Sequence, residues 1–430
     1  MAEATVSKKK KIRRSDYQYT VFKAMRNGDW ITRLSFLIMG FGNIVRKQFV
    51  KGLSFLVLES IFIYFMIKNG ASLLTDFFHL GGAEQEKVWN DAKGIFEYTQ
   101  GDNSLLMLLY GVATVFIIFA FVCLWVVSVE SAYRAQCLHD AGKKVPGFTD
   151  DIKSLFDKNL HMFLLPLPVL GIVVFTILPL VFMICMAFTN YSKLDSHTVL
   201  FNWVGLKNFA KILNFNDAVG STFWSVLGWT LVWAVAATFT NYIFGMILAM
   251  VINRKGTRCK SVWRSIFMLS AAVPQFVSLL LMRTIFSQNG IVNTLLLNHH
   301  IIDNAIPFWS NATIARIMVI VINIWIGIPF TMLQVTGVLQ NIPADLYEAA
   351  KVDGAGPVKT FFKITLPYML FVTGPYLITT FTGNINNFNV IYLLSGGGPI
   401  TDLSSTSGKT DLLVTWLYKL SVDQQDYHIA

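Results

Sequence analysis

The sequence predicts an all-α integral membrane protein, and its composition and hydropathy carry that prediction. Of its 430 residues, 54% are hydrophobic and only 14% are charged, whereas soluble domains contain about 25% charged residues. The mean hydropathy is +0.53. Such a chain has too few polar side chains to cover a water-facing surface, and it contains seven apolar segments that suit membrane-spanning helices.

Each apolar segment is predicted to form one spanning helix, because about 20 mostly apolar residues cross the hydrocarbon core. The first, residues 52–67, is short, but Lys51 and Lys68 flank it and their long stems can extend it. Residues 31–45 contain Arg33 and two glycines, and are predicted to form a helix at the membrane surface. The other predicted spans are residues 105–129, 162–188, 223–252, 265–286, 314–339 and 368–394.

The distribution of basic residues predicts the orientation. Residues 1–51 carry twelve Lys and Arg against three acids, including four consecutive lysines at residues 8–11. With the N-terminus inside, the cytoplasmic segments carry 25 basic residues and the external segments carry 8. Cytoplasmic loops are enriched in Lys and Arg, so the N-terminus is predicted to be cytoplasmic. The basic arm is then expected to contact anionic membrane lipid, not nucleic acid.

Three ionisable side chains lie within the predicted spans, namely Glu59, Arg283 and Arg316. Charges inside a membrane are candidates for function, but arginines near helix ends often extend to the interface. Glu59 lies in the middle of its segment and needs a partner or a proton. The sequence leaves the role of all three open between function and structure.

No motif supports chemistry within this chain, so it is not predicted to be an enzyme. The four cysteines (Cys123, Cys137, Cys185 and Cys259) lack metal-binding spacing, and His299-His300 has no further ligand at a suitable distance, so no metal is expected. Gly408-Lys409-Thr410 lacks the first glycine of a phosphate-binding P-loop. No cofactor is expected, and any ATP must be used by a partner subunit.

The predicted cytoplasmic loop at residues 341–367, NIPADLYEAAKVDGAGPVKTFFKITLP, has the pattern of two short helices. Pro343 can open the first helix, and Gly354 can end it in a left-handed conformation. Pro357 can start the second. The small residues Ala349 and Ala350 allow another chain to approach closely, so the loop is predicted to be a docking surface.

The same loop resembles the EAA signature of binding-protein-dependent ABC importer permeases. The matching positions are Glu348, Ala349, Ala350, Gly354, Ile364, Leu366 and Pro367. In that family, the loop fits a cleft in the ATPase subunit and transmits closure of the ATPase dimer to the spans. The resemblance implies a type I ABC importer transmembrane subunit with a MetI-like core, and it implies ATPase coupling at these seven residues.

Two other segments narrow the resemblance to the MalF-type maltose/maltodextrin transport permease subunit. WVGLKNF at residues 203–209 is similar to an external segment common in sugar-importing members. NINNFNVIYLL at residues 384–394, followed by GGGP at residues 396–399, is similar to the larger maltodextrin permease subunit. The resemblance covers roughly residues 30–430.

Polar residues inside two predicted spans indicate where a sugar binds. Four asparagines fall within six residues at 384–389, and amide groups both donate to and accept from sugar hydroxyls. Hydrogen bonding between helices would also explain them. The resemblance implies that the matching positions line a sugar site in mid-membrane, and the predicted substrate-path residues are Asn323, Gly327, Phe330, Thr380, Asn384 and Asn387.

The predicted organisation has three parts. Residues 1–51 form a basic arm and interfacial helix, residues 52–221 form the leading spans with external loops, and residues 222–430 form the permease core. Members of this type continue into one more span. An eighth span is therefore expected after residue 430.

The expected function is import of maltose or maltodextrin across the bacterial plasma membrane. The resemblance implies four kinds of partner: a homologous permease subunit, an ATPase subunit dimer, an extracellular sugar-binding protein and membrane lipid. Import of another oligosaccharide or of glycerol phosphate by the same machinery is the first alternative, and sugar competition separates the two. A membrane-embedded glycosyl-transfer enzyme is a weaker alternative, because such an enzyme needs a pair of carboxylates at the membrane surface and no loop offers a convincing pair.

Overall fold

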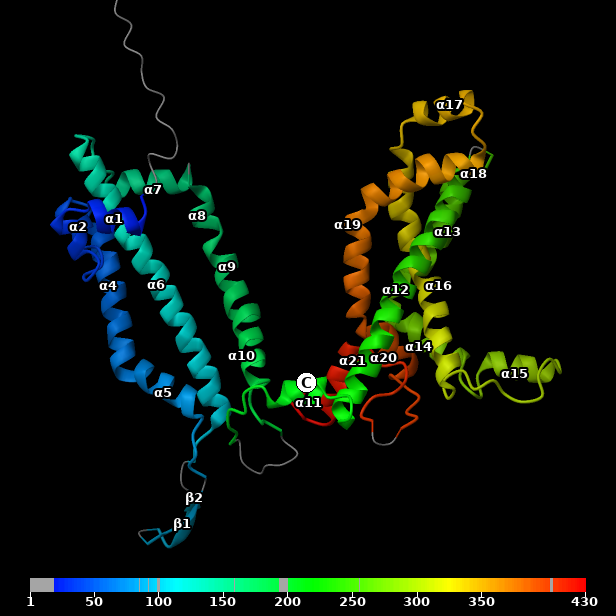
Figure 1. Cartoon of the computed structure of the whole chain (residues 1–430), viewed down its shortest axis with the longest axis horizontal. Coiled ribbons are helices and arrows are strands. Elements are labelled where there is room, and N and C mark those ends of the chain that lie inside the picture. The colour runs from blue at the N-terminus through cyan, green and yellow to red at the C-terminus, as the bar shows by residue number, and fades with distance from the viewer. Residues whose placement is uncertain are drawn as a thin grey trace, which may run out of the picture. The chain divides into compact units, whose positions relative to one another are not determined.

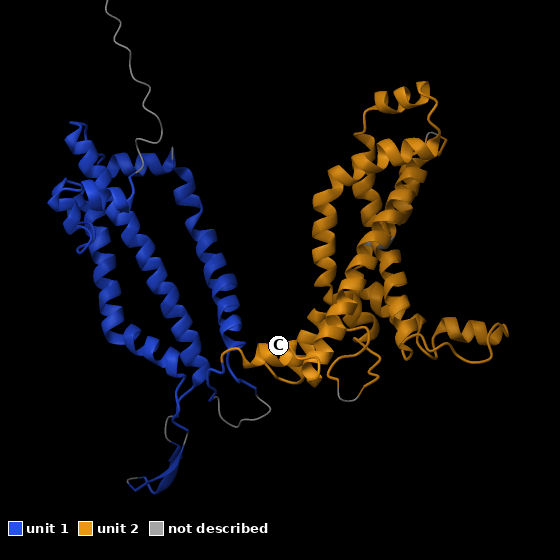
Figure 2. Cartoon of the chain, in the orientation of Figure 1, with its two compact units in different colours: residues 1–204 blue, residues 205–430 orange. Residues whose placement is uncertain are grey.

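A computed structural model describes residues 19–430, except 85, 92, 99–100, 158, 193–199, 255 and 403–404, and except the side chains of residues 270 and 271. The basic run at residues 8–14 lies outside the described residues. The chain forms two compact units, Met1–Val204 and Gly205–Ala430 (Figure 2). This division differs from the three-part organisation expected from the sequence, which stays a prediction.

The first unit contains three long apolar helical segments (Figure 1). In the first, α4 (Phe49–Phe65) continues through a π-helical turn, Met66–Gly70, into α5 (Ala71–His79). The second is α6 (Ser104–Asp140), and the third joins α9 (Pro166–Ile172), the turn Val173–Ile177 and α10 (Leu178–Met186). The strands β1 (Lys87–Asn90) and β2 (Ile95–Tyr98) pair as an antiparallel hairpin. The short helices are α1 (Val21–Asn27), α2 (Trp30–Leu34), α3 (Phe41–Val45), α7 (Phe148–Phe156) and α8 (Leu160–Leu164).

The single interfacial helix predicted for residues 31–45 is wrong. The structure has two helices there, α2 and α3, separated by a turn that ends at Gly40 with φ of 80°. A Cβ atom on Gly40 would lie 2.2 Å from the carbonyl oxygen of Gly52, so glycine allows the turn to pack against α4. Glu59 accepts a hydrogen bond from the backbone N–H of Met39 at 2.8 Å, which gives this carboxylate a structural partner.

The second unit is built around α12 (Ala218–Asn253), α16 (Ala312–Gln340) and α19 (Leu366–Ile385). Helices α12 and α16 pack closely because glycines face the partner helix: Gly245 lies against Thr331, and Gly327 lies against Asn241. The remaining elements are α11 (Lys207–Leu213), α13 (Lys260–Ala272), α14 (Gln275–Ile285), α15 (Ile291–Asn298), α17 (Ala344–Val352), α18 (Pro357–Thr360), the π-helical turn Phe361–Thr365, α20 (Phe388–Ser395), α21 (Leu413–Tyr418) and the π-helical turn Lys419–Asp423.

Six helical segments in the described part of the chain are long and apolar enough to cross a membrane, against seven predicted spans. The difference lies at residues 265–286, where one continuous helix was wrongly predicted. Helix α13 ends at Ala272 and α14 begins at Gln275, with Val273 in an extended conformation. Pro274 explains the break, because proline lacks a backbone N–H and disfavours helical backbone in the residue before it.

Two apolar cores in the second unit leave a polar layer between them. One core contains Trp233 and Ile322, and the other contains Tyr242 and Met332. On α12, Asn241 lies after Ala237 of the first core and directly before Tyr242 of the second. Asn323 on α16 similarly follows Ile322. The polar positions of these helices therefore fall at one level of the bundle.

Candidate functional site: a polar pocket and an exposed coupling loop

A pocket of about 370 Å³ opens at this polar layer. It is lined by α12, α16, α19 and the break between α13 and α14. Five of the six predicted substrate-path residues line it: Asn323, Gly327, Phe330, Thr380 and Asn384. The structure thus gathers residues from two separate predicted spans, although their role toward a sugar stays a prediction.

Asn387, the sixth predicted residue, does not line the pocket. Its side chain caps α20 by accepting from the backbone N–H of Val390 at 3.3 Å. Its amide nitrogen donates to Oδ1 of Asn384 at 3.3 Å. Asn384 in turn donates from Nδ2 to Oγ1 of Thr238 at 3.0 Å. Asn387 therefore orients Asn384, which does line the pocket.

Two buried amide atoms at the pocket have no hydrogen-bond partner among the described residues: Oδ1 of Asn241 and Nδ2 of Asn323. One is an acceptor and the other is a donor. A buried polar atom without a partner costs about 1–3 kcal/mol, and such atoms are rare in folded proteins. Asn241 and Asn323 both line the pocket, and amide side chains can donate to and accept from hydroxyl groups, so the pocket is suited to hydroxylated ligands.

Aromatic side chains complete the pocket. Trp325 and Phe330 both line it and are about half exposed, with exposed fractions of 45% and 51%. Their faces can stack against the apolar face of a sugar ring. The sequence argument missed Asn241, Gln275, Ser278 and Tyr376, which also line the pocket. Asn241 carried a detectable signal, since a lone asparagine in an apolar span is costly against lipid.

The loop predicted to dock a partner has the expected two-helix form. Helix α17 is followed by Gly354, whose φ of +70° is left-handed, and α18 begins at Pro357. The backbone N–H of Ala355 closes the turn by donating to the carbonyl of Ala350 at 2.8 Å. The hydroxyls of Tyr347 and Thr365, 3.1 Å apart, tie α17 to the segment that enters α19.

Three of the seven predicted coupling residues in this loop are buried or half-buried, and the other four are exposed. Glu348 and Ala349 are exposed, but Ala350 is buried against the rest of the chain, with only 8% exposed. Ala350 therefore helps to position α17, and its role in ATPase coupling stays a prediction. Leu366 packs beside the second apolar core, Ile364 is half-buried, and Pro367 is exposed at the start of α19. Val352 and Val358 add apolar surface, at 88% and 70% exposed.

No group of three or more His, Cys, Asp or Glu side chains that could hold a metal ion occurs in the part of the chain that the structure describes. The arrangement is instead that of a membrane permease. It combines apolar helices, a polar pocket between two cores, and an exposed helical loop.

Residues 241–412 match the model of the binding-protein-dependent transport system inner membrane component. The galactooligosaccharides transport system permease protein GanP of Bacillus subtilis is 34% identical, over 92% of this chain and 90% of that protein. The maltodextrin transport system permease protein MdxF of the same organism is 33% identical, over 90% of this chain and 86% of that protein. The chain therefore belongs to the family of binding-protein-dependent transport permeases, and it is not an enzyme.

One further relative and one solved structure are also similar to this chain. The maltose/maltodextrin transport system permease protein MalF of Escherichia coli is 37% identical over 240 residues, which are 54% of this chain and 45% of that protein. A bacterial ABC transporter involved in the import of the acidic polysaccharide alginate has a similar fold, with a TM-score of 0.50 and 21% identity, over 64% of this chain and 90% of that one.

Proposed function

We propose that this chain is a pore-forming subunit of an ATP-driven importer for maltose and maltodextrins. The observation that carries the proposal is the pocket lined by the amide side chains of Asn241, Asn323 and Asn384 and by two half-exposed aromatic side chains. Such a pocket suits a neutral, hydroxyl-rich ligand. Several relatives are named as maltodextrin or maltose/maltodextrin permeases, which supports the choice of sugar.

In this proposal the chain works with four partners: a homologous permease, two copies of an ATPase and an external sugar-binding protein. The ATPase docks on Glu348 and Ala349 of α17 and on the neighbouring apolar surface. ATP binding turns the pocket outward, and hydrolysis returns it inward, so that the sugar has access from one side at a time. The machinery lies in a bacterial plasma membrane with the N-terminus of this chain in the cytoplasm.

Uptake of labelled maltotetraose tests the substrate. A strain lacking this gene is complemented with the natural gene, with Asn323→Ala, or with Asn298→Ala as a matched control from an exposed position at the end of α15. We expect uptake from the natural gene and the control. Asn323→Ala should raise the apparent KM for maltotetraose about tenfold, because the variant loses hydrogen bonds to the sugar.

Competition by unlabelled sugars separates the alternatives. Excess maltodextrin should abolish the uptake, and excess galactooligosaccharide or glycerol phosphate should leave it intact. The galactooligosaccharide arm matters because GanP is about as similar to this chain as MdxF is. Absence of maltotetraose uptake from the natural gene, or stronger competition by galactooligosaccharide, would overturn the maltodextrin assignment.

A further inference from the structure

A second, smaller pocket of about 130 Å³ lies near the starts of α12 and α16. Its walls are the first turns of α12, the first turn of α16 and the segment that follows α20. Hydroxyl side chains dominate the lining: Ser221, Thr222, Ser225, Thr401, Ser405 and Ser407. At about 10–15 Å³ of probe-occupied space for each water, the pocket holds on the order of ten waters, which is comparable with a single sugar ring.

Arg316 supplies hydrogen-bond donors to this pocket. Its guanidinium lies 4.4 Å from the ring centre of Trp229, and its Nε donates to the carbonyl of Lys409 at 2.8 Å. Its two terminal nitrogens donate to no described residue, and the ammonium of Lys409 has no partner among the described residues either. The stacking and the Nε bond hold the guanidinium in place, while four of its N–H groups remain for a ligand.

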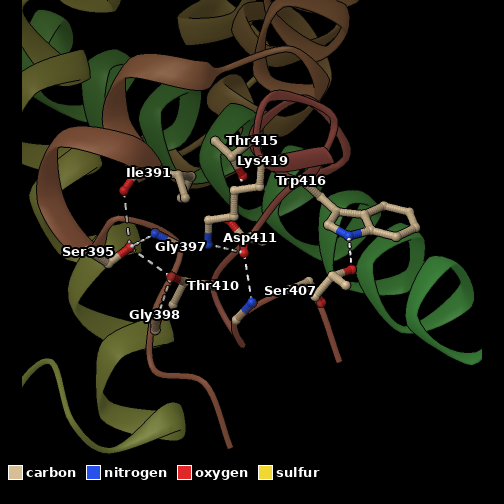
Figure 3. Close-up of polar contacts among 12 residues, drawn as sticks. Ile391, Ser395, Gly397, Gly398, Ser407, Thr410, Asp411, Thr415, Trp416 and Lys419 are labelled. Atoms are coloured by element: carbon tan, nitrogen blue, oxygen red, sulfur yellow. Dashed lines mark hydrogen bonds and ion pairs between the residues drawn. The ribbon is translucent and has the colours of Figure 1, made fainter. Parts of the chain in front are cut away.

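The pocket wall is itself held by a saturated polar cluster (Figure 3). Asp411 is fully buried and accepts from the backbone N–H of Gly408 at 2.7 Å, Oγ1 of Thr415 at 2.9 Å and Nζ of Lys419 at 2.6 Å. Thr410 bonds to Ser395 at 2.7 Å, which ties the same segment to α20. The polar groups of this cluster are satisfied internally, so the charged donors that remain for a ligand are those of Arg316 and Lys409.

The small pocket lies on the same face of α16 as the larger one. Arg316 precedes Asn323 by seven residues, which is about two turns and roughly 10 Å along the helix. Val319 and Ile322 lie between these two levels and belong to a packed core. The two pockets are thus arranged in sequence along one helix and are separated by apolar side chains.

We infer that the small pocket is an outer sugar subsite, which holds one glycosyl unit of the oligosaccharide before it reaches the larger pocket. This inference rests on the proposed function. Arg316 and Lys409 donate to ring hydroxyls, and the serine and threonine hydroxyls can both donate and accept. A small, hydroxyl-lined pocket with both donors and acceptors matches a neutral sugar better than it matches an apolar ligand.

Protection of an introduced cysteine tests the subsite directly. Ser225→Cys is made in a chain whose four cysteines are replaced by serine. The chain is assembled with its partner subunits in nanodiscs with a non-hydrolysable ATP analogue, which holds the path in the outward-facing state. Labelling by a maleimide is then timed with and without maltotetraose. At a sugar concentration about nine times the dissociation constant, labelling should slow about tenfold, because only unoccupied pockets react. Thr313→Cys, exposed at the start of α16 but outside the pocket, is the matched control and should label at an unchanged rate.

Combining Arg316→Gln with Ser225→Cys tests whether protection comes from sugar bound in the small pocket or from a change in the conformation of the protein. Loss of the charged donors should weaken protection of Ser225→Cys about tenfold or more. Arg283→Gln, a second arginine outside this pocket, should leave protection unchanged. An equal labelling rate with and without sugar at Ser225→Cys, in a transporter that imports maltotetraose, would overturn the subsite alone. Undiminished protection of Ser225→Cys in the Arg316→Gln variant would also overturn the subsite alone. A transporter that imports no maltotetraose would instead overturn the proposed function.

Discussion

At the scale of single residues, the larger pocket depends on the contact between Gly327 of α16 and Asn241 of α12. A Cβ atom on Gly327 would lie 2.2 Å from Nδ2 of Asn241, closer than any stable contact allows. The absence of a side chain at Gly327 thus fixes where the Asn241 amide lies, and that amide carries one of the two unpartnered atoms. The glycine acts on the pocket through its neighbour.

Gly327→Ala should therefore impair transport more than stability. The new methyl group pushes the Asn241 amide aside, and apparent KM for the sugar should rise about tenfold, which corresponds to about 1.4 kcal/mol. Gly337→Ala is the matched control, because a Cβ atom there meets open space on the same helix. The control should keep its KM and gain up to about 1 kcal/mol of helix stability. Equal uptake kinetics for the two variants would contradict this role of Gly327.

A second residue-scale prediction concerns the pair Asp29 and Arg46. Nη2 of Arg46 reaches the carboxylate of Asp29 at 2.7 Å, and the side chain of Arg46 is only 5% exposed. Burial raises the pKa of Asp29, but hydrogen bonds from Thr32 and Arg46 outweigh it and hold the pKa below its usual 3.8. A carboxyl group whose pKa is lowered by folding stabilises the folded state above about pH 4, and that stability is lost as the pH falls further.

Asp29→Asn should lower the free energy of unfolding by about 1–2 kcal/mol at neutral pH, since Asp29 is partly exposed and its bonds to Arg46 are screened. Thermal unfolding of the purified protein at pH 7 and near pH 3 measures the effect. The variant should lose part of the pH dependence between these values. Asp157→Asn, at an exposed position after α7, serves as the control. Identical pH dependence in Asp29→Asn and the natural chain would contradict the prediction.

At the scale of elements, the sequence predicted helix boundaries where a proline or glycine constrains its own backbone. It did not predict contacts that depend on how distant segments pack. The proline and glycine positions of the docking loop correctly predicted two helices, because Pro343, Gly354 and Pro357 constrain their own backbone. The burial of Ala350 was not predictable, since it depends on how α17 packs against the second core. The break at Val273 was missed because a hydropathy window counts apolar residues and ignores the proline within it.

The element-scale prediction concerns α17. Glu348→Ala should weaken binding of the ATPase subunit and slow sugar uptake, because Glu348 is an exposed charge beside the apolar surface of the loop. The effect expected for one partly exposed charged contact is about fivefold to tenfold in affinity. Co-purification of the ATPase with the permease measures it. Asp303→Ala changes an exposed acid far from the loop in sequence and should have no effect. Unchanged ATPase binding and unchanged uptake in Glu348→Ala would refute docking at this position.

Five of the fifteen residues that line the candidate pocket were predicted, from polar residues in apolar segments and from the family resemblance, and the other ten required the fold. Asn323 and Asn384 stand out because amides are costly in a span. Gln275 gave the same signal, because it is an amide within the predicted span 265–286, but it was passed over, and Ser278 gave no such signal. The close approach of α12 and α16, which brings Asn241 to the pocket, depends on packing between helices far apart in the sequence.

At the scale of the whole molecule, the excess of basic residues on one side of the spans predicts the orientation of every loop. Cys259 lies in the connection between α12 and α13 and is exposed, and the surrounding loop carries five basic residues within residues 253–264. Thr313, at the start of α16, follows a predicted external loop without Lys or Arg at residues 287–313. The two positions therefore should face opposite sides of the membrane.

Labelling of single cysteines by a membrane-impermeant maleimide tests this orientation. In a chain that retains only Cys259, intact cells should give no labelling and inverted membrane vesicles should give strong labelling. Thr313→Cys in a chain without other cysteines should show the opposite pattern. Denaturation in detergent before labelling controls for a cysteine that is merely unreactive. Labelling of Cys259 in intact cells would place the N-terminus outside, and α17 would then lie on the side that lacks ATP, so docking of an ATPase there would also be refuted.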